Sequence, residues 1–161
     1  MNNISCKNIY KSFQHDNEDM PVLDNINLSI TKGDKIAITG ASGAGKSTLL
    51  QLLAGLDKPS QGNVFIDDID LQAISSIEQS KVRLNSFGFV YQFHHLLHEF
   101  SALENVAMPL LIRGVKKQQA YLQAQEMLTC VDLAHRLSHK PGALSGGERQ
   151  RIAIARSLLK K

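Results

Sequence analysis

Cysteine and long apolar runs are both scarce in this sequence. Its 161 residues include two cysteines, Cys6 and Cys130, whose separation does not match the spacing of metal ligands. We therefore expect neither a redox pair nor a metal site, and we expect both thiols to be small buried groups in a reducing cytosol. No apolar stretch approaches the length that spans a bilayer, and the polar start MNNISCKNIYKS is unlike a signal peptide. Any link to a membrane is therefore expected to go through a partner.

A strong excess of charge is also absent. The 18 Lys and Arg residues nearly balance the 15 Asp and Glu residues, and the net charge of +3 is too small to predict nucleic-acid binding. The basic side chains between Arg149 and Lys161 fit the solvated face and the C-terminal end of a helix, where cations complement the helix dipole. With a hydrophobic content of 43%, the composition is that of a soluble globular protein, and the length suits one domain. No nucleic-acid partner is expected.

Short strand patterns fill the first part of the chain. Apolar and polar residues alternate up to Ile30, which is typical of antiparallel strands, and a polar insert, HDNEDMP (15–21), precedes the last of them. KIAIT (35–39) and FGFVYQ (87–92) are apolar runs suited to buried strands, and NVFIDD (63–68) predicts a further strand. With the helical patterns that follow, these strands predict an α/β protein.

Helical patterns dominate from Ser101 onward. Ser101 and Glu104 form an S-x-x-E capping box, which marks a helix start. Further along, apolar residues recur at helical spacing on one face: Ala120, Ala124, Met127, Leu128 and Val131. A second capping box, Ser145 and Glu148, precedes a predicted buried stripe made of Ile152, Ala155, Leu158 and Leu159.

The stretch GASGAGKS (40–47) has the pattern G-x-x-x-x-G-K-[ST] of a phosphate-binding loop. Glycines let the backbone turn tightly and point its N–H groups at phosphate oxygens. Lys46 supplies a mobile positive charge, and Ser47 supplies a hydroxyl that can ligate Mg²⁺. The helix expected next, STLLQLLA, points its positive end at the same place, and Gly55 is suited to end it. The sequence therefore predicts a nucleotide site, without choosing among kinases, GTPases, helicases and transport ATPases.

The signature stretch LSGGERQ (144–150) makes that choice. A buried helix start explains its capping box, but two consecutive glycines in the first turn cost helix stability. Gly146 and Gly147 would instead let a phosphate approach the helix N-terminus closely. A P-loop kinase that phosphorylates a small acceptor is disfavoured, because LSGGERQ has no part in that chemistry.

Together with the strand-terminal Gln92, the two glycine-rich motifs strongly resemble those of the ATP-binding subunits of ABC transporters. The resemblance implies a P-loop NTPase fold, the ABC nucleotide-binding domain, with an antiparallel β subdomain and a helical subdomain. It also implies a homodimer, in which the signature stretch of one copy covers the γ-phosphate held by the phosphate loop of the other. On this basis residues 1–161 form a single nucleotide-binding domain: a β-rich and P-loop core over about 1–92, a helical subdomain over about 93–143 and a signature helix over 144–161.

The resemblance also assigns roles to individual residues, with ATP and Mg²⁺ as cofactors. The nucleotide-binding loop would consist of Gly40, Ala41, Ser42, Gly43, Ala44, Gly45, Lys46, Ser47 and Thr48. Lys46 and Gln92 would be catalytic, Ser47 and Gln92 would ligate Mg²⁺, and Gln92 would also contact the attacking water. The contacts to ATP in trans would come from Ser145, Gly146, Gly147 and Glu148. Adenine would stack on Phe13, which occupies the usual place in the β region, or on Tyr10 as the alternative.

Within the family, the chain is most similar to the ATPases of bacterial lipoprotein-releasing systems. This similarity is carried by VLDNINLSI, LLAGLDKPSQGNV and FGFVYQFHHLLHEFSALENVAMPLL. It implies that ATP hydrolysis drives lipoprotein release, and that the subunit lies peripherally on the cytoplasmic face of the inner membrane. Residues 92–110 would dock on integral membrane permease subunits, with lipoprotein as an indirect partner. His98 and Ala143 depart from the pattern, so related macrolide-export and cell-division ABC systems stay open as alternatives.

Two further patterns look functional but have simpler explanations. Asp67 and Asp68 follow an apolar strand, as the catalytic acids of P-loop ATPases do, yet their position soon after the phosphate loop favours turn residues. His94, His95 and His98 lack the further ligands that a metal site needs, and are explained by a loop that faces a partner.

The family also places an apolar strand ending in Asp-Glu after the signature helix. The chain stops at Lys161 before any such strand, so we expect this chain alone to lack the general base and to turn over ATP poorly. The same resemblance places the missing core strands between KIAIT and FGFVYQ, so both runs are expected to lack neighbours. We therefore expect roughly two-thirds to three-quarters of a nucleotide-binding domain. A truncated remnant that binds nucleotide without hydrolysing it is the alternative.

Overall fold

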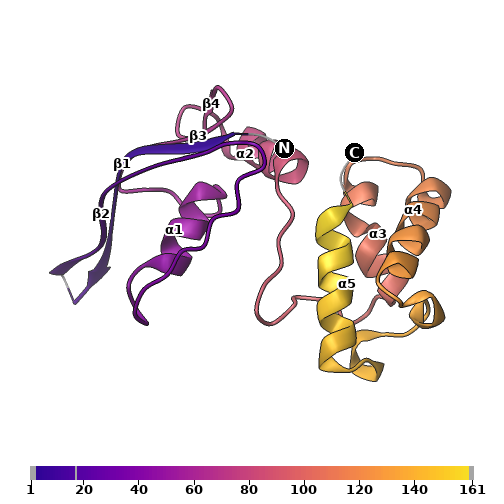
Figure 1. The fold of residues 1–161 in the computed structure, drawn as a ribbon. Coiled ribbons are helices and arrows are strands. Elements are labelled where there is room, and N and C mark those ends of the chain that lie inside the picture. Colours follow the sequence, from indigo (N-terminus) through magenta and orange to yellow (C-terminus); the bar gives the residue numbers. More distant parts are fainter. Residues whose placement is uncertain (1–2, 17, 160–161) are drawn as a thin grey trace. The chain divides into compact units, whose positions relative to one another are not determined.

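The computed structural model describes residues 3–16 and 18–159. The chain divides into two compact units, Met1–Ser86 and Phe87–Lys161. Among the described residues, every strand belongs to the first unit, and the second unit is helical (Figure 1). None of the helices in these residues is long and apolar enough to cross a membrane.

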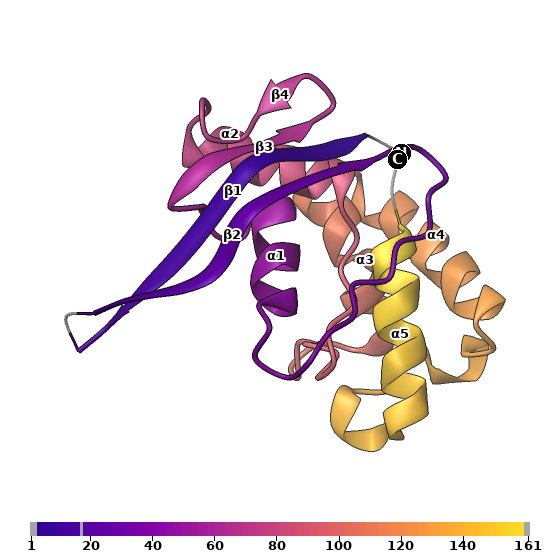
Figure 2. The same ribbon diagram turned by 60° about the vertical axis from the view of Figure 1, so that its left-hand side comes forward.

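An antiparallel sheet forms most of the first unit. Its strands are β1 (Ile4–His15), β2 (Glu18–Ile30), β3 (Gln61–Ile66) and β4 (Ile69–Asp70), in the spatial order β2-β1-β3-β4. β1 is central, and Cys6 pairs with Leu28 of β2 on one side and with Val64 of β3 on the other. β1 and β2 form the long hairpin at one edge of this unit (Figure 2). The antiparallel strands predicted for the first thirty residues are confirmed.

Helix α1 (Lys46–Leu53) packs on the sheet. Leu52 and Leu53 of α1 are buried, and the buried residues of β1 and β3 include Cys6, Ile9, Val64 and Ile66. The helix ends where predicted, because Gly55 takes a φ of +63°, which is unfavourable for a residue with a side chain. This packing fixes the phosphate loop, which immediately precedes α1, against the β subdomain.

Strand β3 passes very close to β1 at Gly62. A Cβ at this position would lie 2.3 Å from the Asn8 carbonyl oxygen and 2.5 Å from that of Lys7, and φ is +86°. Any side chain would therefore collide with backbone. The β1–β3 register shifts between Lys7 and Tyr10, as expected for a β-bulge, which bends a strand and re-aims its side chains. This close approach lies beside the segment that carries Tyr10 and Phe13.

The turn after β3 agrees with the sequence prediction. β3 ends at Ile66, and Asp67 takes a φ of +52°, as a turn residue does. The Asp67 carboxylate accepts a hydrogen bond from the Asn3 N–H at 2.8 Å. Asp67 and Asp68 are therefore turn residues.

Helix α2 (Ser76–Ser86) was not predicted from the sequence. Its start carries a reciprocal pair, in which Ser75 Oγ accepts from the Glu78 N–H at 3.3 Å and the Glu78 carboxylate accepts from the Ser75 N–H at 2.9 Å. The S-x-x-E pattern of a capping box was therefore present. The helix was not predicted because SIEQSKVRLNS is only weakly apolar. The helix buries few of its side chains, Gln79 among them.

The two apolar runs predicted as buried strands, 35–39 and 87–92, are not strands in the structure. Ile36 is 48% exposed and Val90 is 44% exposed. The physical reason is that a strand needs a hydrogen-bonded neighbour, and no described strand pairs with either run. This outcome agrees with the expectation that both runs would lack neighbours. In 87–92, the aromatic rings of Phe87, Phe89 and Tyr91 instead stack along the chain at 5.8 Å spacings.

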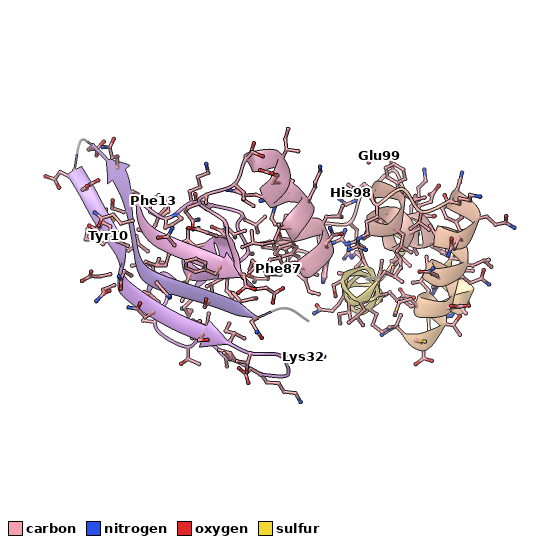
Figure 3. The ribbon with its side chains drawn as sticks, turned by 90° about the horizontal axis from the view of Figure 1, so that it is seen from above. Tyr10, Phe13, Lys32, Phe87, His98 and Glu99 are labelled. Carbon is pink, nitrogen blue, oxygen red and sulfur yellow. The ribbon has the colours of Figure 1, made fainter. Side chains whose placement is uncertain are left out.

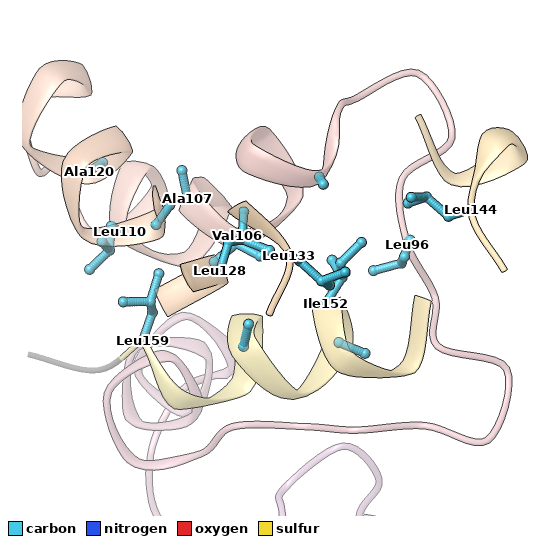
Figure 4. Close-up of a cluster of buried hydrophobic side chains, with 14 residues drawn as sticks. Leu96, Val106, Ala107, Leu110, Ala120, Leu128, Leu133, Leu144, Ile152 and Leu159 are labelled. Atoms are coloured by element: carbon cyan, nitrogen blue, oxygen red, sulfur yellow. The ribbon is translucent and has the colours of Figure 1, made fainter. Parts of the chain in front are cut away.

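The second unit packs three helices around one apolar core. They are α3 (Ala102–Ile112), α4 (Lys117–Cys130) and α5 (Gly146–Leu158), and the short turns η1 (Ala134–Arg136) and η2 (Pro141–Ala143) lead into α5. Figure 4 shows side chains of all three helices meeting in the core. The buried members include Val106, Leu110, Ala120, Ala124, Leu128, Ile152 and Leu159.

The helical predictions for this unit are confirmed with two exceptions. The capping box of Ser101 and Glu104 is present, and Ala120, Ala124 and Leu128 are buried on one face of α4. Leu158 was expected in the buried stripe of α5 but is 57% exposed, because α5 ends at this residue and the chain changes direction at Leu159. Cys130 was expected to be buried but is exposed at the end of α4. Cys6 is buried as predicted, and burial raises the pKa of its thiol.

Candidate functional site

The phosphate loop, residues 40–48, has the backbone of a tight anion-binding turn. Gly40, Gly43 and Gly45 all have positive φ, at +150°, +81° and +79°. At Gly45 a Cβ would lie 2.9 Å from Leu23 and 3.0 Å from the carbonyl oxygen of Val22. Only glycine therefore lets the loop lie this close to β2. At Gly43 an added Cβ would meet no atom within 4 Å, so the tip of the loop is open.

The starts of α1 and α4 carry no side-chain cap, and at α1 this leaves backbone donors open in the phosphate loop. α2, α3 and α5 each begin with a serine–glutamate pair that satisfies N-terminal N–H groups. α1 begins after Gly45 with no side-chain cap and no acidic residue in its first turn. Within the described residues the N–H groups of Lys46, Ser47 and Thr48 make no hydrogen bond. Unpaired donors at the positive end of a helix form the environment that an anionic group satisfies.

Lys46 lies across this loop. Its Nζ donates to the carbonyl oxygens of Gly40 at 2.9 Å and Ala41 at 2.5 Å. The ammonium group is therefore held by the two residues that begin the loop. A phosphate in the loop would face both the backbone N–H groups and this charge.

The two candidate aromatic residues for adenine, Tyr10 and Phe13, both come from β1 (Figure 3). Phe13 is 44% exposed, which leaves ring surface free for a base. The ammonium group of Lys11 lies 4.9 Å from the Phe13 ring centroid, a cation–π contact. Lys11 is itself held by the Asp57 carboxylate at 2.7 Å and by the Lys58 carbonyl oxygen at 2.7 Å. The position of the Phe13 ring is therefore tied to the loop that follows α1.

Sequence reasoning did not identify Lys11 as part of this region. Its side chain is 11% exposed, and its partner Asp57 lies 46 positions further along the chain. Burial alone would raise the pKa of Asp57, but the hydrogen bonds from Lys11 and the Lys58 N–H outweigh it and lower that pKa. No local sequence pattern predicts an ion pair between residues so far apart in the chain.

The signature stretch begins α5 in the second unit with a complete capping box. Ser145 Oγ accepts from the Glu148 N–H at 3.2 Å, and the Glu148 carboxylate accepts from the Ser145 N–H at 2.7 Å. Within the described residues the N–H groups of Gly146 and Gly147 make no hydrogen bond. A Cβ at Gly146 would meet no atom within 4 Å. The cap therefore leaves two open donors in the first turn of the helix.

Acid should weaken this cap. The Ser145 N–H and hydroxyl, together with Arg136, lower the pKa of Glu148 from 4.5 to about 2. A carboxylate whose pKa is lowered on folding stabilises the native state above its unfolded pKa, and this stabilisation is lost as the pH falls toward the native pKa. We expect the free energy of unfolding to fall between pH 4.5 and about 2, and to fall less steeply in Glu148→Gln. Urea unfolding at a series of pH values measures both slopes.

The matched control for that experiment is Glu126→Gln, at an exposed position of α4. It should keep the wild-type slope, since Glu126 caps no helix. Equal slopes for wild type and Glu148→Gln would contradict the assignment of Glu148 as the acid-sensitive cap.

Gln92 is exposed in the first stretch of the second unit, before a loop anchored to α5. Arg156 donates to the carbonyl oxygens of His94 and His95, both at 2.7 Å, and His94 Nε2 lies 3.2 Å from Gln150 Oε1. A cavity of about 350 Å³ beside this loop is lined by Phe93, His94, His95, Leu96, Leu97, His98, Pro141 and Arg149. Within the described residues no group of three or more His, Cys, Asp or Glu side chains is placed to hold a metal.

The predicted site residues thus fall in two groups. The phosphate loop and Phe13 belong to Met1–Ser86, and Gln92 and the signature stretch belong to Phe87–Lys161. Each group has open backbone donors of its own. Two residues that shape these groups, Lys11 and Arg136, were missed because their contacts join positions that no sequence motif connects.

Comparisons with known proteins agree with these motifs. The ABC transporter family matches residues 23–161. The lipoprotein-releasing system ATP-binding protein LolD of Saccharophagus degradans is 53% identical over 156 residues, which cover 97% of this chain and 68% of that protein. LolD of Legionella pneumophila is 52% identical, over 97% of this chain and 69% of its own length.

Two solved structures have a fold similar to that of this chain. The dimeric post-hydrolysis state of the ATP-binding cassette MJ0796, bound to ADP and Pi, matches with a TM-score of 0.89 and 38% identity, over 96% of this chain and 68% of that one. A second dimeric structure of MJ0796, a bacterial ABC transporter cassette, matches at 39% identity with the same TM-score of 0.89. The chain thus has an ABC ATPase fold and an ATP-binding domain, and it shares about half of its residues with these relatives over nearly its whole length. It belongs to the ABC transporter family of ATP-binding proteins.

Proposed function

We propose that this chain is the nucleotide-binding part of an ABC subunit that couples ATP hydrolysis to the release of lipoproteins from the bacterial inner membrane. The observation that supports the lipoprotein system is the 53% identity to LolD over 97% of the chain. The similarity extends beyond the general ATP-binding motifs into FGFVYQFHHLLHEFSALENVAMPLL, the region expected to meet the membrane partner. The subunit would lie peripherally on the cytoplasmic face of that membrane, bound to integral permease subunits.

ATP would be held by two copies of the chain. The loop from Gly40 to Thr48 would bind the β- and γ-phosphates through its open N–H groups, with Lys46 compensating their charge. Ser145, Gly146 and Gly147 of the second copy would meet the γ-phosphate from the other side, and Glu148 would complete that end of the helix. The dimeric MJ0796 cassettes support this pairing by analogy.

The donor set of the phosphate loop also fits Mg²⁺. The exposed Ser47 side chain, at the start of α1, offers a hydroxyl oxygen, the hard ligand that Mg²⁺ prefers, and Gln92 would supply an amide oxygen. Bound there, Mg²⁺ would neutralise charge on the phosphate oxygens. Gln92 would also orient the attacking water.

Phe13 should contribute to nucleotide affinity through stacking. We expect Phe13→Ala to weaken ATP binding by about 1–3 kcal/mol, the scale of one base–aromatic stack, while Phe13→Tyr keeps it near wild type. Titration calorimetry with ATP measures the change, using the polypeptide as the cell makes it, which we call the native polypeptide. Tyr10→Ala is the matched control and should have a smaller effect, and the reverse ranking would move the adenine to Tyr10.

Reconstitution tests the proposed function as a whole. The native polypeptide and its permease subunits would be placed in vesicles that hold a lipidated protein, and ATP would be added outside. We expect ATP-dependent appearance of the lipoprotein in the soluble fraction, and none with Lys46→Ala. Release that survives Lys46→Ala, or ATP hydrolysis that moves the substrates of a macrolide-export system and no lipoprotein, would contradict the proposal.

A further inference from the structure

Arg136, at the end of η1, contacts the signature stretch in the second unit. Its Nε donates to Glu148 Oε1 at 2.8 Å, and the pair is partly shielded, with side-chain exposures of 34% for Arg136 and 13% for Glu148. Its other end, Nη1, lies 3.2 Å from Nε2 of His139. Both residues belong to the segment that leads into α5. Arg136 therefore bridges the segment before α5 to the N-terminus of α5.

The Glu148 carboxylate is fully engaged by this bridge. Its Oε2 accepts from the Ser145 N–H at 2.7 Å, and its Oε1 accepts from Arg136 at 2.8 Å. The open donors of Gly146 and Gly147 lie in the same helical turn. A carboxylate that swung toward them would compete with any anion for these N–H groups and would repel it. The contact with Arg136 holds the carboxylate in its capping position.

The other capping boxes of this chain provide an internal comparison. Glu78 of α2 and Glu104 of α3 close their boxes in the same way, and Glu104 also has Tyr121 as a hydrogen-bond partner. Within the described residues neither carboxylate lies within ion-pair distance of a basic group. Their serine caps, and to a smaller extent the charges of Lys81 and Lys117, lower the pKa of Glu78 and of Glu104. A serine–glutamate box therefore forms in this chain without an arginine. The ion pair is found at the helix start where two glycines leave donors open.

We propose that Arg136 is a positioning residue of the signature stretch: it holds the Glu148 carboxylate against Ser145 and offsets its negative charge, so that Gly146 and Gly147 can donate to a nucleotide phosphate. This inference rests on the proposed function as an ATP-binding subunit. Arg136 does not touch the nucleotide in this account, and acts through Glu148. The charge that it compensates is close to the phosphate, so its removal affects the dimeric state with ATP and leaves the phosphate loop of the same chain unchanged.

A double-mutant cycle tests this role. In the native polypeptide, we expect Arg136→Gln to lower kcat by about tenfold, on the scale of one uncompensated charge beside an anion site, with the affinity of the phosphate loop for ATP unchanged. Glu148→Gln keeps the capping box, because glutamine can replace glutamate in it, but removes the charge. Adding Arg136→Gln to Glu148→Gln should therefore change kcat little, because the charge that Arg136 compensates is already absent. Arg136→Lys, which keeps the charge, should lie close to wild type.

Self-association gives a readout that does not depend on turnover. Sedimentation with the slowly hydrolysed analogue ATPγS should show weaker dimerisation for Arg136→Gln, and no further weakening when Arg136→Gln is added to Glu148→Gln. A purely structural role would lower the free energy of unfolding and would persist in the Glu148→Gln background. A wild-type kcat in Arg136→Gln would overturn the proposal. So would a loss of kcat that is as large when Arg136→Gln is added to Glu148→Gln as when it is made in the wild type. The ATPase activity of Lys46→Ala is measured before the cycle. Activity in that variant would show that the proposed function fails, independently of the role of Arg136.

Discussion

Lys46→Ala is expected to reduce ATP turnover by about 10²–10³-fold, the effect of removing one group that stabilises developing charge in a transition state. Lys46 Nζ lies across the phosphate loop, bonded to the carbonyl oxygens of Gly40 and Ala41. These contacts hold the charge at the start of the phosphate loop. Both bonds are exposed to water, so we expect the free energy of unfolding to change by less than about 0.5 kcal/mol.

Two controls make this measurement specific. Lys32→Ala removes a lysine of the same charge from an exposed loop of the same unit (Figure 3), and should keep wild-type turnover. Lys46→Arg retains the charge but replaces a compact ammonium by a planar fork, so it should restore little activity. The steady-state ATPase rate of the native polypeptide measures all three. If Lys46→Ala turned over ATP within a few-fold of the wild-type rate, the catalytic role of the phosphate loop would be contradicted.

Asn105→Leu is expected to destabilise the second unit by about 3 kcal/mol, because it removes the hydrogen bonds of a fully buried side chain and leaves the Leu97 N–H and the Phe100 carbonyl oxygen without a partner. Asn105 is fully buried in α3. Its side-chain oxygen accepts from the Leu97 N–H at 2.8 Å, and its amide donates to the carbonyl oxygens of Leu97, Phe100 and Ser101 at 3.0, 3.1 and 3.0 Å. One side chain thus fixes the segment that joins the loop after Gln92 to α3.

Urea unfolding of the native polypeptide measures this loss. Asn105→Asp keeps the acceptor for Leu97 but sets a buried carboxylate against three carbonyl oxygens, so it should be at least as destabilising near neutral pH. Asn85→Leu is the matched control at an exposed position of α2 and should stay within about 0.5 kcal/mol of wild type. A wild-type unfolding curve for Asn105→Leu would mean that the four hydrogen bonds contribute no net stability.

Features set by neighbouring residues were predictable from the sequence. The capping boxes at Ser101 and Ser145 formed as expected, because a serine and a glutamate three positions apart satisfy each other's backbone within one turn. The end of α1 at Gly55 follows from the same kind of local rule. The positive φ values of Gly40, Gly43 and Gly45 fit the tight turn that their spacing predicts.

Features set by distant partners were not predictable. The 35–39 and 87–92 runs have the composition of buried strands, but a strand forms only where another strand pairs with it. Leu158 has the right spacing for the core of α5, yet the helix ends at that residue. Lys11 and Arg136 were missed because an ion pair depends on which segments meet in space, and Asp57 and Glu148 lie far from them in the sequence.

Mixing two inactive variants tests whether the phosphate loop of one copy and the signature stretch of another share one ATP. Lys46→Ala has an intact signature stretch, and Ser145→Arg has an intact phosphate loop with the signature helix start blocked. A heterodimer of the two has one site in which both parts are intact. Retention of labelled ATPγS after rapid gel filtration reports whether a nucleotide is enclosed.

The account predicts that neither variant alone retains nucleotide and that the mixture does. Retention should rise as the two variants approach equal amounts, because heterodimers are then most abundant. A mixture that retains no more nucleotide than the separate variants, with heterodimers present by sedimentation, would contradict the shared site.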